Sequence, residues 1–185
     1  MGQKIHPVGF RMGIGATWKS RWFARGPKYK QYVSEDIKIR EILMKKLKTA
    51  GIQSVEIERA VNKLKIIIYV SRPGVLIGRG GSGLTELKKF LMKELKVKSE
   101  NSLEIIPMEV KSADLAAFLV AQGVGEQLAR RMPAQRVMNQ AIDRVMRAGA
   151  KGVRIVISGR IGGAEIARRE WKAAGSMPLH TLRAD

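Results

Sequence analysis

A glycine-rich loop between an apolar strand and a helix most constrains the fold of this chain. The run over residues 64–70 is rich in β-branched side chains and predicts a strand. An Arg-Pro-Gly turn follows it, and four glycines then fall within residues 78–83. Glycine lacks a Cβ, so such a backbone can approach another molecule closely. The helix predicted after the loop has unpaired N–H groups in its first turn, which suits the loop to binding a phosphate.

The hydrophobic pattern around this loop predicts a first α+β domain over residues 34–110. Ser34 is typical of a helix N-cap, and apolar residues at helical spacing continue to Ala50. Alternation over residues 55–58 predicts a strand paired with the one at 64–70. A helix with a narrow apolar stripe follows the loop, and a third strand follows that helix. The predicted order is therefore helix, strand, strand, glycine loop, helix, strand.

A second domain is predicted over residues 111–185. One helix is expected to begin at Ser112, a break falls at Pro133, and a second helix ends at Gly149. A small antiparallel sheet is then predicted from three segments, which are residues 153–158, 164–171 and 176–185. The predicted fold class is therefore α+β, with two helices against an antiparallel sheet in the second domain.

The charge of the chain indicates a polyanionic partner. Lys and Arg number 35 against 16 acidic residues, which gives a net charge of +19 and a pI near 10.7. Such an excess is larger than solubility requires, and it favours nucleic acid over a membrane surface. The sequence has no run of about 18 apolar residues to span a bilayer. It has no Cys and only two His, so no metal site is expected.

Residues 1–33 carry seven Lys or Arg and no acid. Aromatic residues are interleaved with these cations, a composition typical of an arm that neutralises phosphates and stacks on bases. The cations assigned to RNA in this basic arm are Lys4, Arg11, Lys19 and Arg21. The alternative is an irregular lead-in whose aromatic side chains pack on the first domain.

Three interpretations compete for the glycine loop. Gly78, Gly80 and Gly83 match the spacing of a dinucleotide-binding fingerprint, but no acid ends the next strand to hold a ribose. Gly78 and Gly81 also match the G-x-x-G loop of a KH domain, which clamps the backbone of single-stranded RNA. The third interpretation is a glycine turn packed on the protein itself. The strand order and the charge favour the KH loop, with Arg79 as a phosphate contact.

Further blocks of sequence are specific enough to indicate a family, and they run from the first residue to the last: 1–7, 72–74, 149–152, 158–168 and 178–185. In this order they resemble the S-three family of bacterial small-subunit ribosomal proteins. The resemblance implies an N-terminal type II KH domain, a C-terminal α+β domain, and neither enzymatic activity nor a cofactor. It also implies a cytoplasmic, ribosome-associated protein that binds small-subunit rRNA in the subunit head, mRNA at the entry channel, and neighbouring ribosomal proteins.

Two sets of residues are expected to contact RNA. The set assigned to rRNA is the four arm cations together with Arg72, Gly78, Arg79, Gly80, Gly81, Lys88, Lys89, Arg160 and Arg168. The set that the resemblance assigns to the mRNA entry channel is Arg130, Arg131, Arg136 and Arg144. Gln135 and Asn139 stand where enterobacterial relatives have Arg and Lys, so weaker mRNA unwinding is expected. Family members usually continue past Asp185, so the second domain is expected to be short.

The sequence leaves two other functions open. One is a free KH-type regulator that binds single-stranded RNA without joining a ribosome. The other is a nucleotide-dependent enzyme that uses the glycine loop, although no nucleophile and base can be paired along the chain. Sedimentation with ribosomal subunits separates the first of these from a ribosomal protein.

Overall fold

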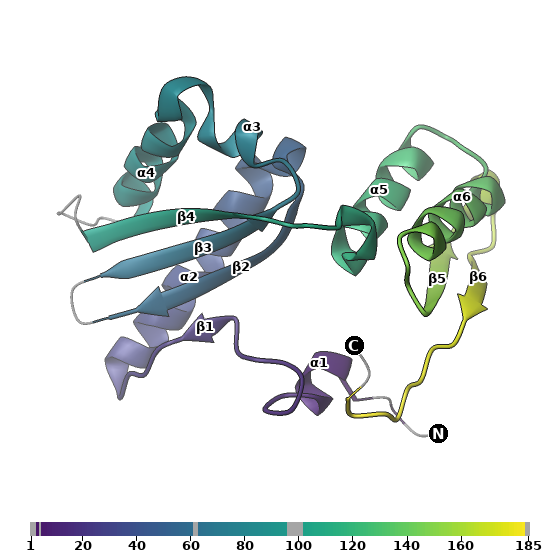
Figure 1. The fold of residues 1–185 in the computed structure, drawn as a ribbon, viewed down its shortest axis with the longest axis horizontal. Coiled ribbons are helices and arrows are strands. Elements are labelled where there is room, and N and C mark those ends of the chain that lie inside the picture. The colour runs from purple at the N-terminus through teal and green to yellow at the C-terminus, as the bar shows by residue number, and fades with distance from the viewer. Residues whose placement is uncertain (1–2, 4, 61–62, 96–101, 184–185) are drawn as a thin grey trace. The chain divides into compact units, whose positions relative to one another are not determined.

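The computed structural model of the protein describes residues 3, 5–60, 63–95 and 102–183. The chain divides into two compact units, Met1–Lys111 and Ser112–Asp185, and each holds helices and a sheet (Figure 1). The predicted α+β class is confirmed in both units. No helix within the described part of the chain is long and apolar enough to cross a membrane.

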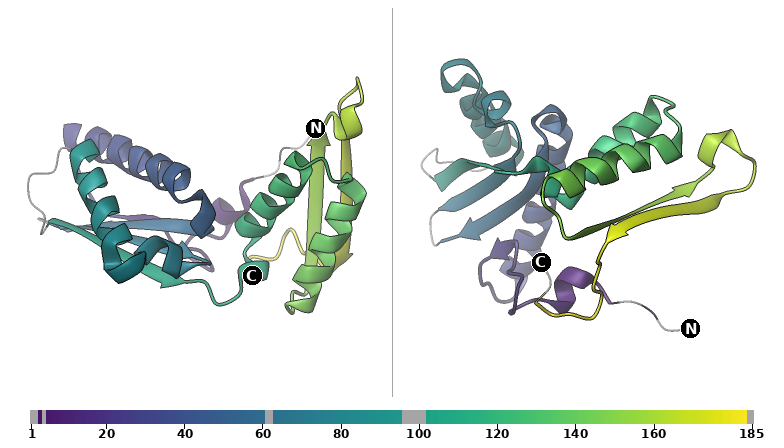
Figure 2. Two further views of the ribbon diagram at one scale, coloured as in Figure 1. Left: turned by 90° about the horizontal axis from the view of Figure 1, so that it is seen from above. Right: turned by 45° about the vertical axis from the view of Figure 1, so that its right-hand side comes forward.

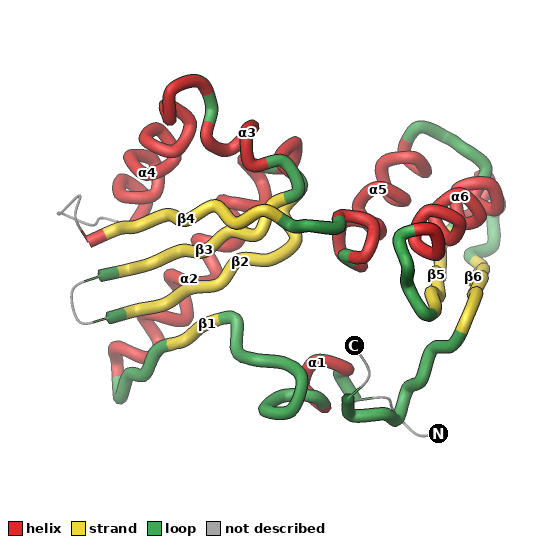
Figure 3. Tube along the Cα trace, viewed as in Figure 1, coloured by secondary structure: helices red, strands yellow, loops and turns green. Residues whose placement is uncertain are grey.

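The first unit is built on a four-stranded sheet. Its strands are β1 (Ser20–Arg21), β2 (Ile52–Arg59), β3 (Leu64–Val70) and β4 (Leu103–Glu109). Its α-helices are α1 (Pro7–Phe10), α2 (Pro27–Lys46), α3 (Pro73–Ile77) and α4 (Ser82–Leu95) (Figure 3). The strands lie in the order β1-β2-β3-β4, and β2 pairs antiparallel with β3, whereas the β1–β2 and β3–β4 pairs are parallel. The predicted succession of helix, strand, strand, glycine loop, helix and strand is confirmed.

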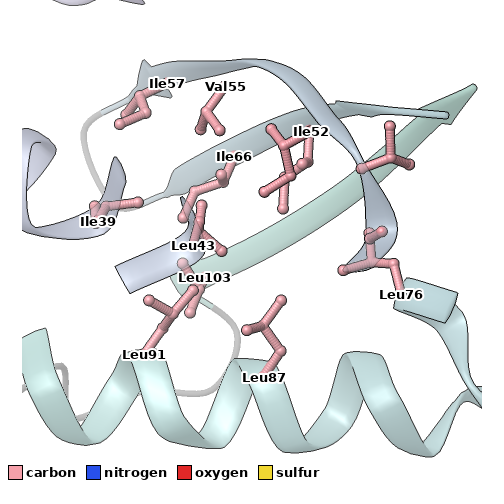
Figure 4. Close-up of a cluster of buried hydrophobic side chains, with 13 residues drawn as sticks. Ile39, Leu43, Ile52, Val55, Ile57, Ile66, Leu76, Leu87, Leu91 and Leu103 are labelled. Atoms are coloured by element: carbon pink, nitrogen blue, oxygen red, sulfur yellow. The ribbon is translucent and has the colours of Figure 1, made fainter. Parts of the chain in front are cut away.

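One face of this sheet forms the core of the first unit. Alternate residues of β3, Ile66, Ile68 and Val70, are fully buried, as the period of two in a half-covered strand requires. Leu43 of α2 and Leu91 of α4 pack into the same cluster, so both helices cover this face (Figure 4). Burying each such side chain stabilises the fold by about 1.5–3 kcal/mol. The cluster also includes Leu76 of α3 and Leu87 of α4, so it fixes the two helices that the glycine loop joins.

The first long helix begins earlier than the predicted Ser34. α2 begins at Pro27, after Gly26 with φ 61°, and proline suits this position because its φ is preset and its missing N–H is not needed. Ser34 therefore lies inside the helix and is not its N-cap. The extra turns are held by Tyr32, whose ring meets that of Trp22 edge-on at 5.4 Å between centroids.

The second unit packs two helices on a hairpin. Its elements are α5 (Ala117–Ala129), α6 (Ala134–Arg147), β5 (Gly152–Gly159) and β6 (Arg168–Gly175). The strands pair antiparallel, and α6 packs on the hairpin with α5 beside it, as the right-hand view of Figure 2 shows. The core of this unit joins Val124 of α5, Val137 and Ala141 of α6, and Ile155 and Ile157 of β5.

Three predictions for the second unit are wrong, two of them in the first residue of an element and the third in expecting a strand. The first helix begins at Ala117 and not at Ser112, because a short 3-10 turn and an extended Ala116 precede it. The returning strand begins at Arg168 and not at 164, because a turn built on Gly162 and Gly163, both with positive φ, takes up the residues between. The described residues of the predicted last strand, 176–183, form no strand.

Candidate nucleic-acid interface

The glycine loop joins α3 to α4, and its backbone needs glycine at several positions. Gly78, Gly80 and Gly81 have φ of 71°, 61° and 81°, a region that other residues rarely adopt. A Cβ on Gly83 would lie 2.6 Å from the carbonyl oxygen of Leu76, and one on Gly78 would lie 2.9 Å from the backbone nitrogen of Gly83. The two outer glycines of the loop therefore let its ends pack against each other.

The middle of the loop is open to a ligand. A Cβ built on Gly80 or Gly81 would meet no atom within 4 Å, and the Arg79 side chain is exposed. The Ser82 hydroxyl donates to the Arg79 carbonyl at 2.9 Å, which fixes the turn from within. A rigid, side-chain-free backbone with a cation beside it is what a phosphate contact requires.

Three other predicted cations lie on the elements that flank the loop. Arg72 precedes α3 and is exposed. Lys88 and Lys89 lie about two turns into α4, where Lys89 is exposed and Lys88 is half-buried. Arg72, Arg79 and Lys89 therefore lie along one α3–loop–α4 segment, and Glu86 is the single acid between Arg72 and Lys89.

The basic arm is fastened to the first unit through one buried acid. Asp36 of α2 is 2% exposed, and its carboxylate accepts hydrogen bonds from Trp22 Nε1 at 2.8 Å and Ser20 Oγ at 2.9 Å. Arg59 of β2 completes the site, because its guanidinium lies 2.6 Å from Asp36 Oδ1 and 2.7 Å from Glu35 Oε2. We call Ser20, Trp22, Glu35, Asp36 and Arg59 the arm anchor.

The arm cations differ in their surroundings. Arg21 forms ion pairs of 3.2 Å with both Glu56 and Glu58 of β2, and an Arg11 guanidinium N–H donates to the Pro7 carbonyl at 3.2 Å. Lys19 is exposed, whereas Lys4 falls outside the described residues. Because β1 and β4 are opposite edges of the sheet, and α4 packs beside β4, the arm and the glycine loop are separate surfaces.

Cations also line the outer face of α6. Its inner face buries Val137, Met138 and Ala141, which leaves Arg136 and Arg144 exposed on the other side. Arg130 and Arg131 lie in the connection from α5 and are exposed as well, with Arg131 held at φ 61°.

Asn139 on this face has a cationic neighbour that sequence reasoning missed. The Lys172 ammonium of β6 donates to the Asn139 side-chain carbonyl at 2.7 Å. The contact depends on which residues of β6 point toward α6. The strand predicted over residues 164–171 ended before Lys172, so the pairing of β6 with β5 was needed to find this contact.

Arg160 and Arg168 flank the turn of the β5–β6 hairpin. Arg160 Nε donates to the Ala164 carbonyl at 2.8 Å and so closes the turn, while Arg168 Nε lies 3.1 Å from Glu170 Oε1. Both side chains remain exposed. Across the described residues, no three His, Asp or Glu side chains are grouped to hold a metal ion.

Comparison with known proteins places both units in families. Residues 38–115 match the model of the KH domain, and residues 124–185 match that of the ribosomal protein S3 C-terminal domain. The small ribosomal subunit protein uS3 of Myxococcus xanthus is 49% identical over 185 residues, which are 100% of this chain and 82% of that protein. The uS3 proteins of Desulfatibacillum aliphaticivorans and Coprothermobacter proteolyticus are 48% and 47% identical over the whole of this chain. The match spans 83% and 78% of the length of these two proteins. With a KH glycine loop in its first unit and this degree of identity from end to end, the chain belongs to the uS3 family of small ribosomal subunit proteins.

Proposed function

We propose that this protein is a structural constituent of the small ribosomal subunit that binds rRNA in the subunit head. The observation that carries the proposal is 49% identity to a uS3 protein across all 185 residues. Membership in a family of ribosomal proteins also confirms the prediction that the chain is not an enzyme. Its partners are then small-subunit rRNA and neighbouring ribosomal proteins, and it works on ribosomes in the cytoplasm.

Within this function, the glycine loop clamps an RNA backbone. The open space at Gly80 and Gly81 and the exposed Arg79 support this role, as does the run without acids from Arg72 to Thr85. The arm supplies a second contact along the other edge of the sheet. There Lys19 is exposed toward solvent, whereas Arg21 first has to share its guanidinium with Glu56 and Glu58.

Sedimentation tests the ribosomal assignment directly. The protein is expected to travel with small subunits through a sucrose gradient after washing at high salt, because a buried multi-site contact is screened less than surface attraction alone. Recovery only in the free fractions would contradict the proposal and would favour a free KH-type regulator of single-stranded RNA.

The outer face of α6 is proposed to guide mRNA at the entry channel. Arg136 and Arg144 are eight residues apart, or about 12 Å along the helix axis, so they can contact successive parts of one strand. Arg130 and Arg131 extend the same cationic path in the connection that leads from α5 into α6. Lys172 brings a further positive charge to Asn139, where enterobacterial relatives carry a cation on the helix itself.

Replacing Arg136 and Arg144 with glutamine is expected to slow translation of an mRNA with a stable internal hairpin about twofold. An unstructured message of the same length is expected to be translated at the normal rate, because only strand separation needs the phosphate path. The measurement is peptide synthesis by purified ribosomes that carry the variant. Lys45→Gln with Lys93→Gln removes the same charge from exposed positions of the first unit and serves as the control. Equal slowing of both messages would contradict a role in unwinding.

A further inference from the structure

The β5–β6 hairpin has one face that α5 and α6 do not cover. Ile155 and Ile157 point toward the helices and pack in the core of the second unit. Val156 between them points the other way, as do its alternate neighbours along β5 and the residues of β6 that pair with these, and all of them are exposed. We call this the outer hairpin face, and it consists of Arg154, Val156, Ser158, Arg169, Trp171 and Ala173.

Trp171 is the centre of the outer hairpin face. It pairs across the strands with Val156, yet its side chain is 59% exposed. The guanidinium carbon of Arg154 lies 5.0 Å from the centroid of its ring, which is a cation–π contact. An aromatic ring exposed beside a cation offers a flat apolar face and a positive charge to a partner that can stack on it.

The charge on the outer hairpin face indicates the chemical class of its partner. Arg154 and Arg169 lie on either side of Trp171, and neither of these fully described strands turns an acid to this face, since Glu170 points to the other side. Arg169 lies two residues along the strand from Trp171, or about 7 Å. Two arginines on either side of an exposed aromatic ring, with no acid on the same face, match a phosphate backbone that carries an unpaired base.

We propose that the outer hairpin face is an RNA-binding surface that stacks one unpaired base on Trp171 and Arg154. Exposed aromatic rings on a sheet, and guanidinium planes, are the groups on which proteins stack unpaired bases. Arg169 then contacts a phosphate of the same strand. This surface is on the second unit and goes beyond the rRNA contact proposed for the glycine loop and the mRNA contact proposed for α6.

Binding of a single-stranded uridine octamer to the 185-residue chain tests this proposal. The measurement is fluorescence anisotropy of the labelled octamer, in a chain whose glycine loop also carries Arg79→Asp and Gly80→Asp to remove its contribution. Trp171→Leu keeps the apolar area but removes the aromatic face, and it is expected to weaken binding about tenfold. Trp171→Phe keeps a stacking face and is expected to stay within about twofold of the parent.

Three further measurements separate base stacking from the phosphate contact and from the loss of any exposed aromatic ring. An octamer of abasic ribose phosphates is expected to bind the parent and the Trp171→Leu chain equally, because no base is left to stack. Arg169→Gln is expected to lower the slope of log affinity against log salt by about 0.7, the value for one phosphate of a single strand. Phe118→Ala removes an aromatic side chain of similar exposure, 51%, from α5 of the same unit and is expected to change nothing.

Photo-cross-linking of a 4-thiouridine octamer to the unmodified chain supplies a readout that does not depend on any variant. A cross-link to Trp171 or its strand neighbours is expected after mass spectrometry of the peptides. Unchanged octamer affinity in Trp171→Leu, without a cross-link within residues 168–175, overturns the proposal and assigns the face to a protein partner. The rRNA role of the glycine loop is unaffected by that outcome, because the loop is tested by its own variants.

Discussion

Replacing Asp36 with alanine is expected to lower the free energy of unfolding of the first unit by about 3–5 kcal/mol. The substitution removes the acceptor for Ser20, Trp22 and Arg59 at once. It also takes one of two carboxylates from the Arg59 guanidinium, whose side chain is 10% exposed, and leaves it with Glu35 and Tyr32. Removing one partner of a buried ion pair costs this much when the remaining charge loses compensation in a site poor in water, and here two further donors lose their acceptor as well.

Urea unfolding followed by far-ultraviolet circular dichroism measures this loss. Asp36→Asn is expected to lose less than Asp36→Ala, because the amide oxygen still accepts one of the hydrogen bonds. Glu41→Ala removes an exposed acid from the same helix and is expected to cost less than about 0.5 kcal/mol. A loss below about 1 kcal/mol for Asp36→Ala would mean that the arm anchor does not stabilise the unit.

The same substitution also separates two roles of the basic arm. Without Asp36, nothing among the described side chains fixes Trp22 by a hydrogen bond, and the arm is expected to become accessible to trypsin at Arg21 and Arg25. Intact small subunits should protect those sites if the arm also contacts rRNA. The two interpretations of the aromatic residues are therefore compatible: Trp22 anchors the arm, while the exposed Trp18 and Phe23 remain for RNA.

The core of the first unit was predictable from sequence because local patterns and tertiary packing agree there. Residues 64–70 alternate in burial as the strand pattern requires, and Leu87 and Leu91 lie one turn apart on the buried stripe of α4. The glycine loop was also located correctly, because strand, turn and helix signals meet within about fifteen residues of sequence.

Interactions between distant segments explain what the sequence did not reveal. The local sequence at Gly26-Pro27 is typical of a loop, yet α2 begins there. The first turns of the helix are held because the Tyr32 ring packs on Trp22 and on Arg59, whose guanidinium carbon lies 4.4 Å from the Tyr32 ring centroid. Likewise, Arg21 was assigned to RNA from composition alone, although the parallel β1–β2 pairing brings it to Glu56 and Glu58. No local pattern contains that pairing.

The second unit shows how an error in the bounds of one strand hides residues that are assigned a function here. The returning strand was predicted over 164–171, but the positive-φ glycines delay it to Arg168–Gly175. The predicted span ended before Lys172, and only the pairing of Trp171 with Val156 and of Lys172 with Ile155 shows that Trp171 faces outward and Lys172 faces α6. Both residues could then be connected to a surface, one to the outer hairpin face and the other to Asn139.

Replacing Arg79 and Gly80 together with aspartate is expected to weaken binding of the uridine octamer about ten- to hundredfold at low salt, or about 1.4–2.8 kcal/mol. Arg79 is exposed, and a side chain at Gly80 meets no atom within 4 Å, so the fold should tolerate both changes. Aspartate is also among the few residues that accept the left-handed backbone at this position. The two carboxylates would stand where the proposed phosphate lies, and repulsion replaces attraction there.

The salt dependence and two control variants identify the cause of that loss. If one phosphate contact disappears, the slope of log affinity against log salt falls by about 0.7. Lys93→Asp changes the net charge as much as Arg79→Asp does, but on an exposed position farther along α4, so it is expected to have a small effect. Gly80→Ala introduces the backbone strain without the charge, and it is expected to leave affinity nearly unchanged. Equal losses in Lys93→Asp and Arg79→Asp would show that the octamer senses only net charge, and the glycine loop would then be a turn that serves the fold alone.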